Sequence, residues 1–469
     1  MNEYTDFLAS KVQPAKPSGF DVDVDADYLF PFQRDCVKWA LRQGRSALFE
    51  DTGLGKTRQQ LEWARHVVEH ARRTGESPRV LLLAPLAVGT QTVREAAECD
   101  IPGVRIARHQ SDVEDGITVT NYDALHHFEA DTFTGVVLDE SSILKAFSGR
   151  MKQSLVSAFA RTPYRLACTA TPAPNDHLEL GNHSEFLGVL SSHQMIARWF
   201  INDTSTFGTY KLKGHAVGPF WDWVCSWARC VGKPSDIGKY SDDGYILPEL
   251  NLHRHVVGVD IVEGRGGALF RIVDTSATNL HREKRRTAKS RALRVAELIH
   301  AEPHERWLVW VDTDYDADAI RGAIPDVVEV RGSDDPTVKS ERLLGFADGK
   351  IRVLVTKPKI AGYGMNWQGC ARVAFVGPSY SYEQFYQAVR RCWRFGQSRA
   401  VDVHVIQAAT EGAVWETISR KAGDHDGLKL QMFAASRRAQ SRAAQPETYN
   451  PTVTGRLPDW LTTEPSWTL

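Results

Sequence analysis

Short apolar runs alternate with amphipathic stretches over two long blocks of the chain. In the block 25–188 the runs are SALFE (46–50), VLLLAP (80–85), ITVTN (117–121), VVLDE (136–140) and RLACTAT (165–171). In the block 276–423 they are WLVWV (307–311), VVEV (327–330), IRVLVT (351–356), RVAFVG (372–377) and VDVHVI (401–406). Each run is short enough for a buried parallel strand, and helical patterns lie between the runs. The alternation predicts an α/β protein with two wound domains built on parallel sheets.

Three segments depart from this pattern and set the expected domain boundaries. Residues 1–24 contain Pro and Gly breakers, and they predict an N-terminal tail. Residues 189–275 are rich in Trp, Gly and Lys, and they predict a partly helical insertion between the two domains. Residues 424–469 lose the periodicity, so we expect one short helix followed by a C-terminal tail.

The composition is that of an ordinary globular chain. Of 469 residues, 42% are hydrophobic, and the net charge of −1 means that any nucleic-acid site must be a local basic patch. The seven cysteines form no CxxC pair, which favours free thiols in a reducing cytoplasm. The N-terminus has no apolar region and no run of about 18 apolar residues occurs, so we expect neither a signal peptide nor a membrane partner.

A glycine loop stands between the first apolar run and a helical stretch. The segment DTGLGKT follows SALFE and precedes RQQLEWARHVVEHARR. Gly53 and Gly55 allow backbone N–H groups to turn toward a phosphate, and the helix N-terminus adds partial positive charge. Lys56 would neutralise the β- and γ-phosphates, and the Thr57 hydroxyl would bind Mg²⁺. Strand, loop and helix together predict a phosphate loop.

Two acidic residues end the fourth apolar run, VVLDE. Asp139 would orient Mg²⁺, directly or through water, and Glu140 would polarise the water that attacks the γ-phosphate. A pair of solvated carboxylates at a strand end is the simpler explanation when the pair stands alone. The phosphate loop about 80 residues earlier in the same α/β block favours the catalytic interpretation.

Nine segments resemble, in order and spacing, the motifs of Swi/Snf-like superfamily-two helicases and translocases. They are FPFQRDCVKWAL, DTGLGKT, LLLAPLAVGTQTVRE, TNYDAL, LDESSILK, LACTATP, EVRGSDDPTVKSERLLGF, KIAGYGMNW and QAVRRCWRFGQ. The resemblance covers 30–188 and 287–420 and implies two tandem RecA-like domains that bind ATP with Mg²⁺. Two positions depart from the family. Ser141 and Ser142 follow the acidic pair where the family reads DEAH, and Arg390 stands where the family has an acidic residue.

The resemblance also implies which residues contact the nucleotide. Gln33 would read the adenine, and the phosphate-loop residues would cradle the phosphates: Thr52, Gly53, Leu54, Gly55, Lys56 and Thr57. Gly364 and Gln397 of the second domain would also bind the cofactor, with Gln397 reporting nucleotide state. Arg391 and Arg394 lie three residues apart, so on a helix they would share a face and reach the γ-phosphate as arginine fingers.

Nucleic-acid contacts are expected to read the phosphate backbone and not the base sequence. The resemblance implies such contacts at Thr120, Thr169, Thr171, Ser333 and Thr356. The stretch HREKRRTAKSRALR (281–294) adds seven Lys and Arg residues against one Glu. On a helix, one face would carry Arg282, Arg285, Arg286 and Lys289. A solvated linker helix accounts equally well for this stretch.

The expected activity is that of an ATP hydrolase that moves along DNA, with duplex DNA as the first candidate. A strand-separating or RNA-directed helicase is an alternative within enzymes. A DNA-binding clamp or scaffold that hydrolyses ATP slowly is an alternative of another class. The small size favours a minimal prokaryotic or phage-type member, acting in a bacterial or host cytoplasm, with the nucleus left open. A separate nuclease or replication protein would then be a partner.

Overall fold

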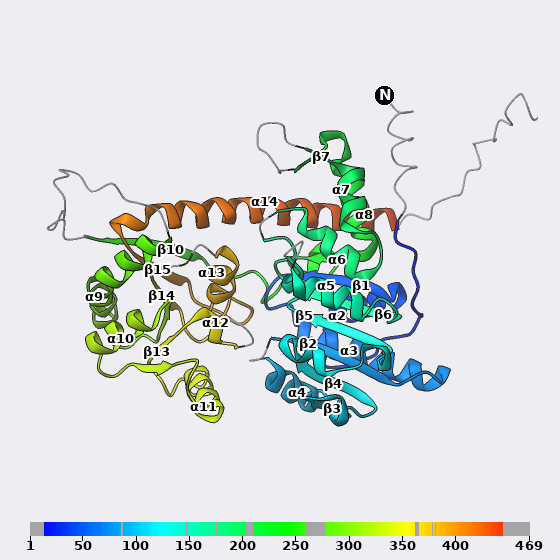
Figure 1. The fold of residues 1–469 in the computed structure, drawn as a ribbon, viewed down its shortest axis with the longest axis horizontal. Helices are drawn as coiled ribbons and strands as arrows, with labels where there is room; N and C mark the ends of the chain where they lie inside the picture. Colours follow the sequence, from blue (N-terminus) through cyan, green and yellow to red (C-terminus); the bar gives the residue numbers. More distant parts are fainter. Residues whose placement is uncertain are drawn as a thin grey trace, which may run out of the picture.

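The computed structural model describes most of the chain between residues 14 and 443. Within that range it does not describe 86–87, 146–148, 175, 203–209, 259–276, 362–364, 378 and 380. Two α/β domains lie side by side, and a long C-terminal helix crosses both of them (Figure 1). The wound α/β architecture expected from the apolar runs is confirmed, because each domain contains a parallel sheet.

The first sheet has seven strands in the order β3-β4-β2-β5-β6-β1-β9, all paired in parallel. Its strands are β1 Arg45–Glu50, β2 Arg79–Ala84, β3 Val104–Ile106, β4 Gly116–Asn121, β5 Gly135–Asp139, β6 Tyr164–Thr169 and β9 Ala228–Val231. Its helices are α2 Pro31–Gln43, α3 Lys56–Thr74, α4 Gly89–Glu98, α5 Arg150–Ala158, α6 Glu179–Leu187, α7 Ser192–Trp199 and α8 Val217–Trp227.

The second sheet has six parallel strands in the order β10-β15-β14-β11-β13-β12. Its strands are β10 Leu250–Val257, β11 Trp307–Val311, β12 Val328–Val330, β13 Val353–Thr356, β14 Arg372–Val376 and β15 Val401–Ala408. Its helices are α9 Ala277–Ala301, α10 Asp314–Ala323, α11 Pro336–Ala347, α12 Pro358–Ala361, α13 Tyr382–Val389 and α14 Gly412–Ala443.

The central strands of both sheets are buried on their two faces, which explains why they read as continuous apolar runs. Neighbouring residues along a strand point to opposite faces. In β1, Leu48 packs into one core and Phe49 into the other. In β11, Trp310 faces one core, whereas Trp307 and Val309 face the other. The carboxyl ends of the strands, where the loops carry polar residues, remain available for a site.

Residues 189–275 contribute to both sheets as well as forming helices. Helices α7 and α8 make this segment partly helical, as expected, and β7 Phe200–Asn202 and β8 Tyr210–Leu212 form a small antiparallel hairpin. Strand β9 then extends the first sheet beside β1, and β10 forms an edge of the second sheet. The four residues of β9 are too short to show a period in the sequence, so only tertiary pairing reveals them.

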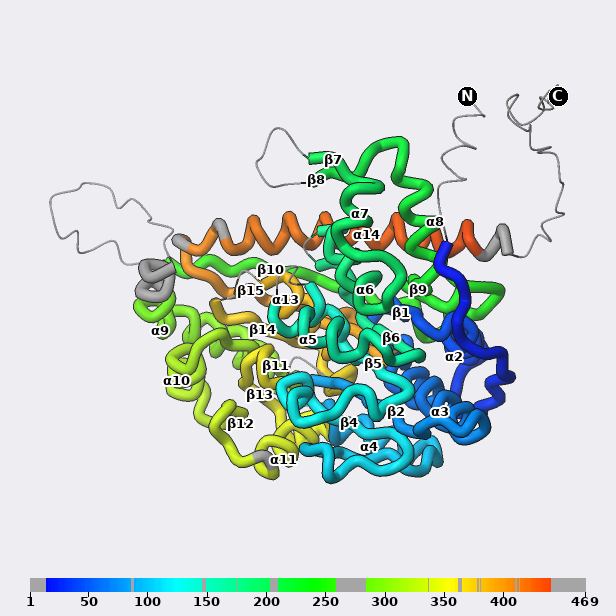
Figure 2. Tube along the Cα trace, turned by 45° about the vertical axis from the view of Figure 1, so that its right-hand side comes forward, coloured from blue at the N-terminus to red at the C-terminus, as the bar shows by residue number. Residues whose placement is uncertain are grey.

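Helix α14 is far longer than the short helix expected near residue 424. It runs from Gly412 to Ala443, starting over the second domain and ending against α8 of the first (Figures 1 and 2). Gly423 and Gly427 disfavour a helix locally, which explains the expectation. Packing overrides that preference: Leu428 and Met432 enter the first domain's core. The Trp221 indole N–H also donates to Gln431 Oε1 over 3.1 Å.

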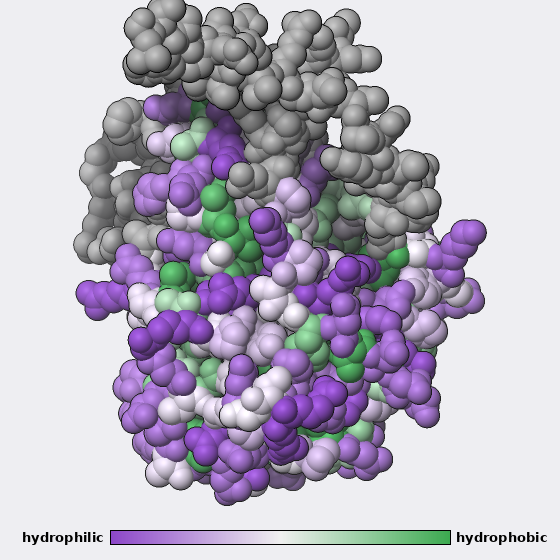
Figure 3. All heavy atoms as spheres, turned by 90° about the vertical axis from the view of Figure 1, so that its right-hand side faces the viewer, coloured by the Kyte–Doolittle hydropathy of each residue, from purple (hydrophilic) through white to green (hydrophobic). Residues whose placement is uncertain are grey.

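The end of the molecule that the first domain forms is mainly hydrophilic, with small, separate apolar patches among the described residues in view (Figure 3). Within the described part of the chain, no helix combines the length and the apolar character needed to cross a bilayer.

Candidate active site

The phosphate loop joins the carboxyl end of β1 to the N-terminus of α3, as the sequence predicts. Gly53 and Gly55 have φ values of 97° and 81°, in the left-handed region that favours glycine. Gly55 has a second reason to lack a side chain, because a Cβ there would lie 2.3 Å from Gln33 Nε2. The loop therefore holds a conformation that exposes backbone N–H groups at a helix N-terminus.

Gln33 and Lys56 both contact the backbone of this loop. Gln33 Nε2 donates to Leu54 O over 2.7 Å, while its Oε1 accepts from Phe30 N over 2.9 Å. Lys56 Nζ donates to Glu50 O and Asp51 O at 2.9 and 3.1 Å. Thr57 follows as the second residue of α3 and is half-buried. The residues of the first domain that were expected to bind the cofactor thus lie in this loop or contact it. Their binding of a nucleotide stays a prediction.

Asp139 and Glu140 lie at the carboxyl end of β5, at the same edge of the parallel sheet as the phosphate loop. Gln60 Nε2 of α3 donates to Asp139 Oδ1 over 2.8 Å, and Thr169 Oγ1 donates to Glu140 Oε2 over 3.2 Å. Burial raises the pKa of both carboxyls, and the charge of Asp139 raises that of Glu140 further. The positive charge of Lys56 opposes both shifts, so lysine and carboxylates share one electrostatic environment.

This arrangement fits a Mg²⁺ ion and a triphosphate. Asp139 is buried and Glu140 is half-buried, and neither makes an ion pair with a side chain in the described part of the chain, so a cation would offset the cost of burying their charge. Gln60 Oε1 and Thr52 Oγ1 nearby are buried without a hydrogen-bond partner among the described residues. Mg²⁺ commonly takes one or two protein oxygens and fills its shell with phosphates and water. Asp139 and Thr57 would be those two ligands.

A histidine that no local sequence pattern distinguishes holds the turn after Glu140. Glu140 has φ of 55°, and residues Ser141–Lys145 continue as a 3₁₀ turn. His183 of α6 lies fully buried with Nε2 3.1 Å from Ser141 Oγ. Burial lowers the pKa of His183 to about 4, so the ring is neutral. A histidine therefore contacts the acidic motif from another helix, although Ser142 replaces the motif's own.

Arg391 and Arg394 do not lie on a helix, which corrects the expectation of a shared helix face. Helix α13 ends at Val389, and the arginines follow in consecutive turns. The reason is tertiary: Trp367 N donates to Arg391 O over 2.9 Å and so uses the carbonyl that a continuing helix would need.

Both arginines nevertheless lie close enough to the first domain to influence the electrostatics of its carboxyls. Arg391 contributes to the electrostatics of Asp139 and Glu140, and its Nη2 donates to Gln387 Oε1 over 3.1 Å. Burial, together with the charges of Arg391 and Arg390, lowers the pKa of Arg394 to about 9. An arginine near buried carboxylates across a domain boundary is suited to stabilising negative charge on a phosphoryl group.

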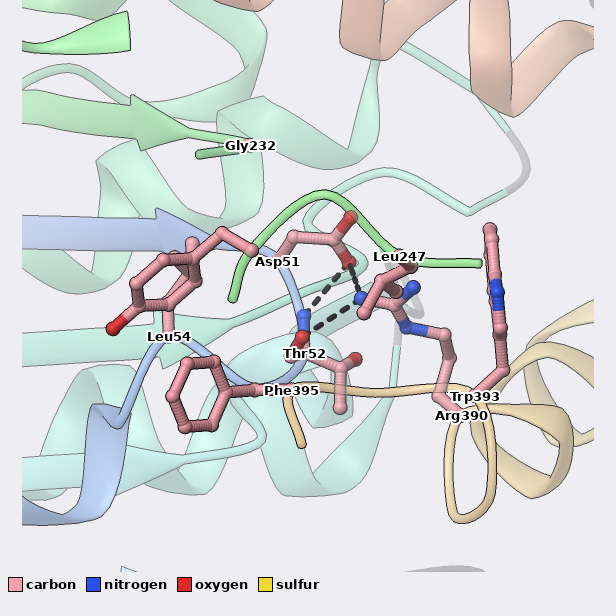
Figure 4. Close-up of a pocket in the computed structure, with 9 residues that line it drawn as sticks. Asp51, Thr52, Leu54, Gly232, Leu247, Arg390, Trp393 and Phe395 are labelled. Carbon is pink, nitrogen blue, oxygen red and sulfur yellow. Dashed lines mark hydrogen bonds and ion pairs between the residues drawn. The ribbon is translucent and has the colours of Figure 1, made fainter. Parts of the chain in front are cut away.

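Arg390, which stands where the family has an acidic residue, contacts the phosphate loop directly. Its Nη2 donates to Thr52 O over 2.7 Å and lies 3.1 Å from Asp51 Oδ1 (Figure 4). The guanidinium carbon lies 4.9 Å from the centroid of the Trp393 ring, which holds the side chain in place. The arginine cluster is thus larger than the two residues that spacing suggested.

A cavity of about 220 Å³ opens beside the loop, between the two domains. It is lined by Asp51, Thr52, Leu54, Gly232, Tyr245, Leu247, Arg390, Trp393 and Phe395 (Figure 4). Tyr245 comes from the segment that joins the domains, and its ring centroid lies 4.8 Å from that of Phe395. Aromatic rings beside a phosphate loop provide faces against which a nucleobase can stack.

Gln397 and Gly364 are the other second-domain residues that were expected to bind the cofactor. Gln397 Nε2 donates to Cys370 O and Cys392 O at 3.0 and 3.3 Å, so its side chain braces its own domain. Gly364 lies outside the described residues.

Of the five residues that the family resemblance places at the nucleic-acid backbone, one is exposed in this structure. Ser333 is exposed, whereas four threonine side chains are buried: Thr120, Thr169, Thr171 and Thr356. Thr169 and Thr171 instead connect Glu140 to the end of β6, since Thr171 N donates to Thr169 Oγ1 over 3.0 Å. Of these five residues, Ser333 is therefore the one that could meet a phosphate directly in this conformation.

The basic stretch 281–294 lies in the middle of α9, as part of a helix. Its solvent face carries Arg285, Arg286 and Lys289, and the side chain of Arg282 lies outside the described residues. Lys284 and Arg291 on the opposite face are buried, with Lys284 Nζ 2.9 Å from Asp312 Oδ2 and Arg291 Nη2 2.7 Å from Asp316 Oδ1. Two of the six basic side chains described in this stretch are therefore structural.

Comparison with known proteins gives matches over both domains. Residues 32–213 match the family model of the SNF2-related domain, and residues 290–396 match that of the helicase conserved C-terminal domain. The TATA-binding protein-associated factor mot1 of Schizosaccharomyces pombe is 33% identical over 104 residues, which are 22% of this chain and 5% of that protein. This chain therefore spans only a small part of that relative's length. The SWI2/SNF2 ATPase core of Sulfolobus solfataricus in complex with dsDNA is 17% identical, with a TM-score of 0.39, over 86% of this chain and 97% of that one.

Proposed function

We propose that this chain, which belongs to the Swi/Snf-like branch of superfamily-two helicases, is a motor that uses ATP hydrolysis to move along duplex DNA. The chain is an ATP hydrolase of the helicase type. The observation that carries the proposal is the contact of Arg390 with the phosphate loop at Asp51 and Thr52. Residues of both domains meet at this loop. Binding of a nucleotide there is therefore coupled to how closely the two domains approach each other.

The hydrolytic step is assigned to the residues gathered around the loop. Lys56 and the loop N–H groups hold the phosphates, while Thr57 and Asp139 hold Mg²⁺, which would neutralise charge on the β- and γ-phosphates. Glu140 orients the attacking water through a carboxylate fixed by Thr169. Arg391 and Arg394 stabilise the negative charge that develops on the γ-phosphoryl group. The aromatic walls of the cavity receive the base, and Gln33 donates to Leu54, one of the cavity residues.

Movement would follow from closing and opening the two domains around this site. Ser333 and the exposed face of α9 belong to the second domain, whereas the segment at Thr120 belongs to the first. If each domain holds the DNA backbone, a change in domain apposition shifts one contact relative to the other. Contacts of this kind neutralise phosphates and carry no sequence information, so we propose binding without sequence preference.

The test is ATP hydrolysis measured without nucleic acid and then with duplex DNA, single-stranded DNA or RNA. Strong stimulation by the duplex is expected, and stimulation confined to single strands or RNA would instead favour the helicase alternative. Glu140→Gln should abolish turnover while ATP binding persists, whereas Lys56→Ala should lose both. Measurable turnover by a clean Glu140→Gln preparation would contradict the role of Glu140.

A slow, nucleotide-gated clamp is the second candidate, and one observation favours it. The acidic motif lacks its usual histidine, and Ser141 instead contacts a neutral, fully buried His183. Weak coupling between hydrolysis and DNA binding would leave a slow ATPase that no nucleic acid stimulates. A partner protein such as a nuclease or replication factor would then supply the biological activity.

A further inference from the structure

Groups from three parts of the chain meet at one carboxylate oxygen of the phosphate loop. Asp51 Oδ1 accepts from Thr52 N over 2.7 Å and from the Tyr386 hydroxyl over 2.5 Å. Two cations lie at the same oxygen, Arg390 Nη2 at 3.1 Å and Lys429 Nζ at 3.2 Å. Burial opposes ionisation of Asp51, but the charges of Arg390 and Lys429 outweigh it and hold the pKa of this carboxyl below its usual range. Asp51 is therefore negatively charged at neutral pH.

Lys429 comes from α14, which lies beyond both segments that match the family models. Its Nζ also donates to the Tyr386 hydroxyl over 2.6 Å and lies 4.7 Å from that ring's centroid. The neighbouring Leu428 and Met432 pack into the first domain's core, so the helix cannot rotate away without exposing apolar surface. The position of Lys429 over the loop is thus fixed by the docking of α14.

The two cations at Asp51 have different tasks. The guanidinium of Arg390 lies against Asp51 and also donates to the carbonyl oxygen of Thr52 over 2.7 Å. Lys429 makes no such backbone contact at the loop, and its charge acts on the carboxylate and on Tyr386. Without Lys429, a negative charge beside the phosphate loop would be compensated by one shared cation only. That charge would repel the polyphosphate of an incoming nucleotide.

We propose that Lys429 is a positioning residue of the ATP site: it neutralises Asp51 from helix α14 and so makes nucleotide affinity depend on the docking of that helix. The proposal rests on ATP binding at the phosphate loop and is independent of movement along DNA. It adds a third component, α14, to a site that the two domains form. Any ligand or partner that lifts α14 from the first domain would then weaken ATP binding.

Helix α14 offers a matched control in a second ion pair to the first domain. Arg437 Nη1 lies 3.5 Å from Asp236 Oδ1, eight residues farther along the helix than Lys429. Substitution there breaks a second ion pair between α14 and the first domain, one with a more exposed cation, and leaves Asp51 untouched. An effect of docking alone would appear in both variants, whereas an effect through Asp51 would appear only at Lys429.

The experiment measures the Kd of a fluorescent ATP analogue with Mg²⁺ for the full chain, four single variants and one double variant. We expect Lys429→Met to raise Kd about tenfold, as for loss of a charge-assisted contact, and Lys429→Arg to restore most of the affinity. Arg437→Met should leave Kd unchanged. In an Asp51→Asn background, Lys429→Met should change Kd by less than about twofold, because the charge to be neutralised is gone.

Three results would overturn the proposal. They are an unchanged Kd for Lys429→Met, an equal rise in Kd for Arg437→Met, and an undiminished effect of Lys429→Met in the Asp51→Asn background. Should Asp51→Asn not fold, the ratio of Kd between Lys429→Met and the unsubstituted chain is measured at rising salt. That ratio must fall if the effect is electrostatic. Absence of ATP binding by the unsubstituted chain would refute the ATP site itself, whereas absence of DNA stimulation would refute only the motor.

Discussion

His425 provides a quantitative test of how α14 is held against the second domain. The imidazole is 1% exposed, and neither ring nitrogen has a hydrogen-bond partner among the described residues. Its centroid lies 5.5 Å from the Tyr382 ring and 5.3 Å from the Tyr386 ring. Burial and then the charge of Lys429 lower the pKa of His425 to about 3, and Asp51 opposes the shift. The ring is therefore neutral at pH 7 and resists protonation as the pH falls.

The sign of the pH effect follows from the lowered pKa. In the unfolded chain the imidazole titrates near pH 6.5. Above that value it is neutral in both states and the full stability is present. Below it, only the unfolded state gains the proton, so stability falls until the folded pKa is reached. At pH 5 the loss from this one group is about 2 kcal/mol.

His425→Phe removes this titration and keeps an aromatic ring against both tyrosines. At pH 7 the variant should be more stable by about 1 kcal/mol, because two unsatisfied ring nitrogens are replaced by carbon. Between pH 7 and pH 5 it should lose about 2 kcal/mol less than the unsubstituted chain. Other histidines with a lowered pKa, such as His183 and His404, titrate in both proteins, so their contributions cancel in the comparison.

The assay is urea-induced unfolding at pH 7 and pH 5, followed by tryptophan fluorescence. His300→Phe is the control, because it removes an exposed imidazole from α9; its loss between the two pH values should match that of the unsubstituted chain. If His425→Phe loses as much stability on acidification as the unsubstituted chain, then His425 is not buried and uncharged as argued.

Two further predictions concern the phosphate loop and the basic helix. Gly55→Ala should reduce ATP affinity at least about tenfold, because a side chain at φ of 81° is strained and its Cβ would displace Gln33, which lies 2.3 Å away; titration with a fluorescent nucleotide measures this, and wild-type affinity would refute it. Charge reversal of the exposed Arg285 and Lys289 on α9 should weaken DNA binding and reduce its salt dependence. Filter binding at low and moderate salt tests the second prediction, and unchanged affinity at both would reject α9 as a DNA contact.

The local sequence pattern was sufficient for the architecture and for the loop that carries the site. Strands such as WLVWV are buried on both faces, so they appear in the sequence as continuous apolar runs. Such a run can be recognised without knowing which distant residues pack against it. The phosphate loop is equally local, because strand, glycines, lysine and helix follow one another in the chain. The carboxylates Asp139 and Glu140 could be chosen because a strand end places them at the sheet's carboxyl edge.

Contacts between residues far apart in the chain could not be predicted from the local sequence pattern. The end of α13 before Arg390 depends on a hydrogen bond from Trp367, and helix pattern alone favours continuing through Arg394. His183 has no distinguishing neighbours in the sequence, yet it reaches Ser141 from 42 residues away. Such residues carry no periodic signal, since their partners are set by packing.

The sequence by itself determined the two parallel α/β domains, the phosphate loop and the acidic pair, because each rests on the order of neighbouring residues. The tertiary structure alone decided which side chains surround Asp51. It brought Arg390 to the loop, drew β9 into the first sheet and carried α14 across both domains, so that Lys429 meets a carboxylate 378 residues away in sequence. The physical reason is that burial of apolar surface fixes these elements, and their polar residues are positioned as a consequence.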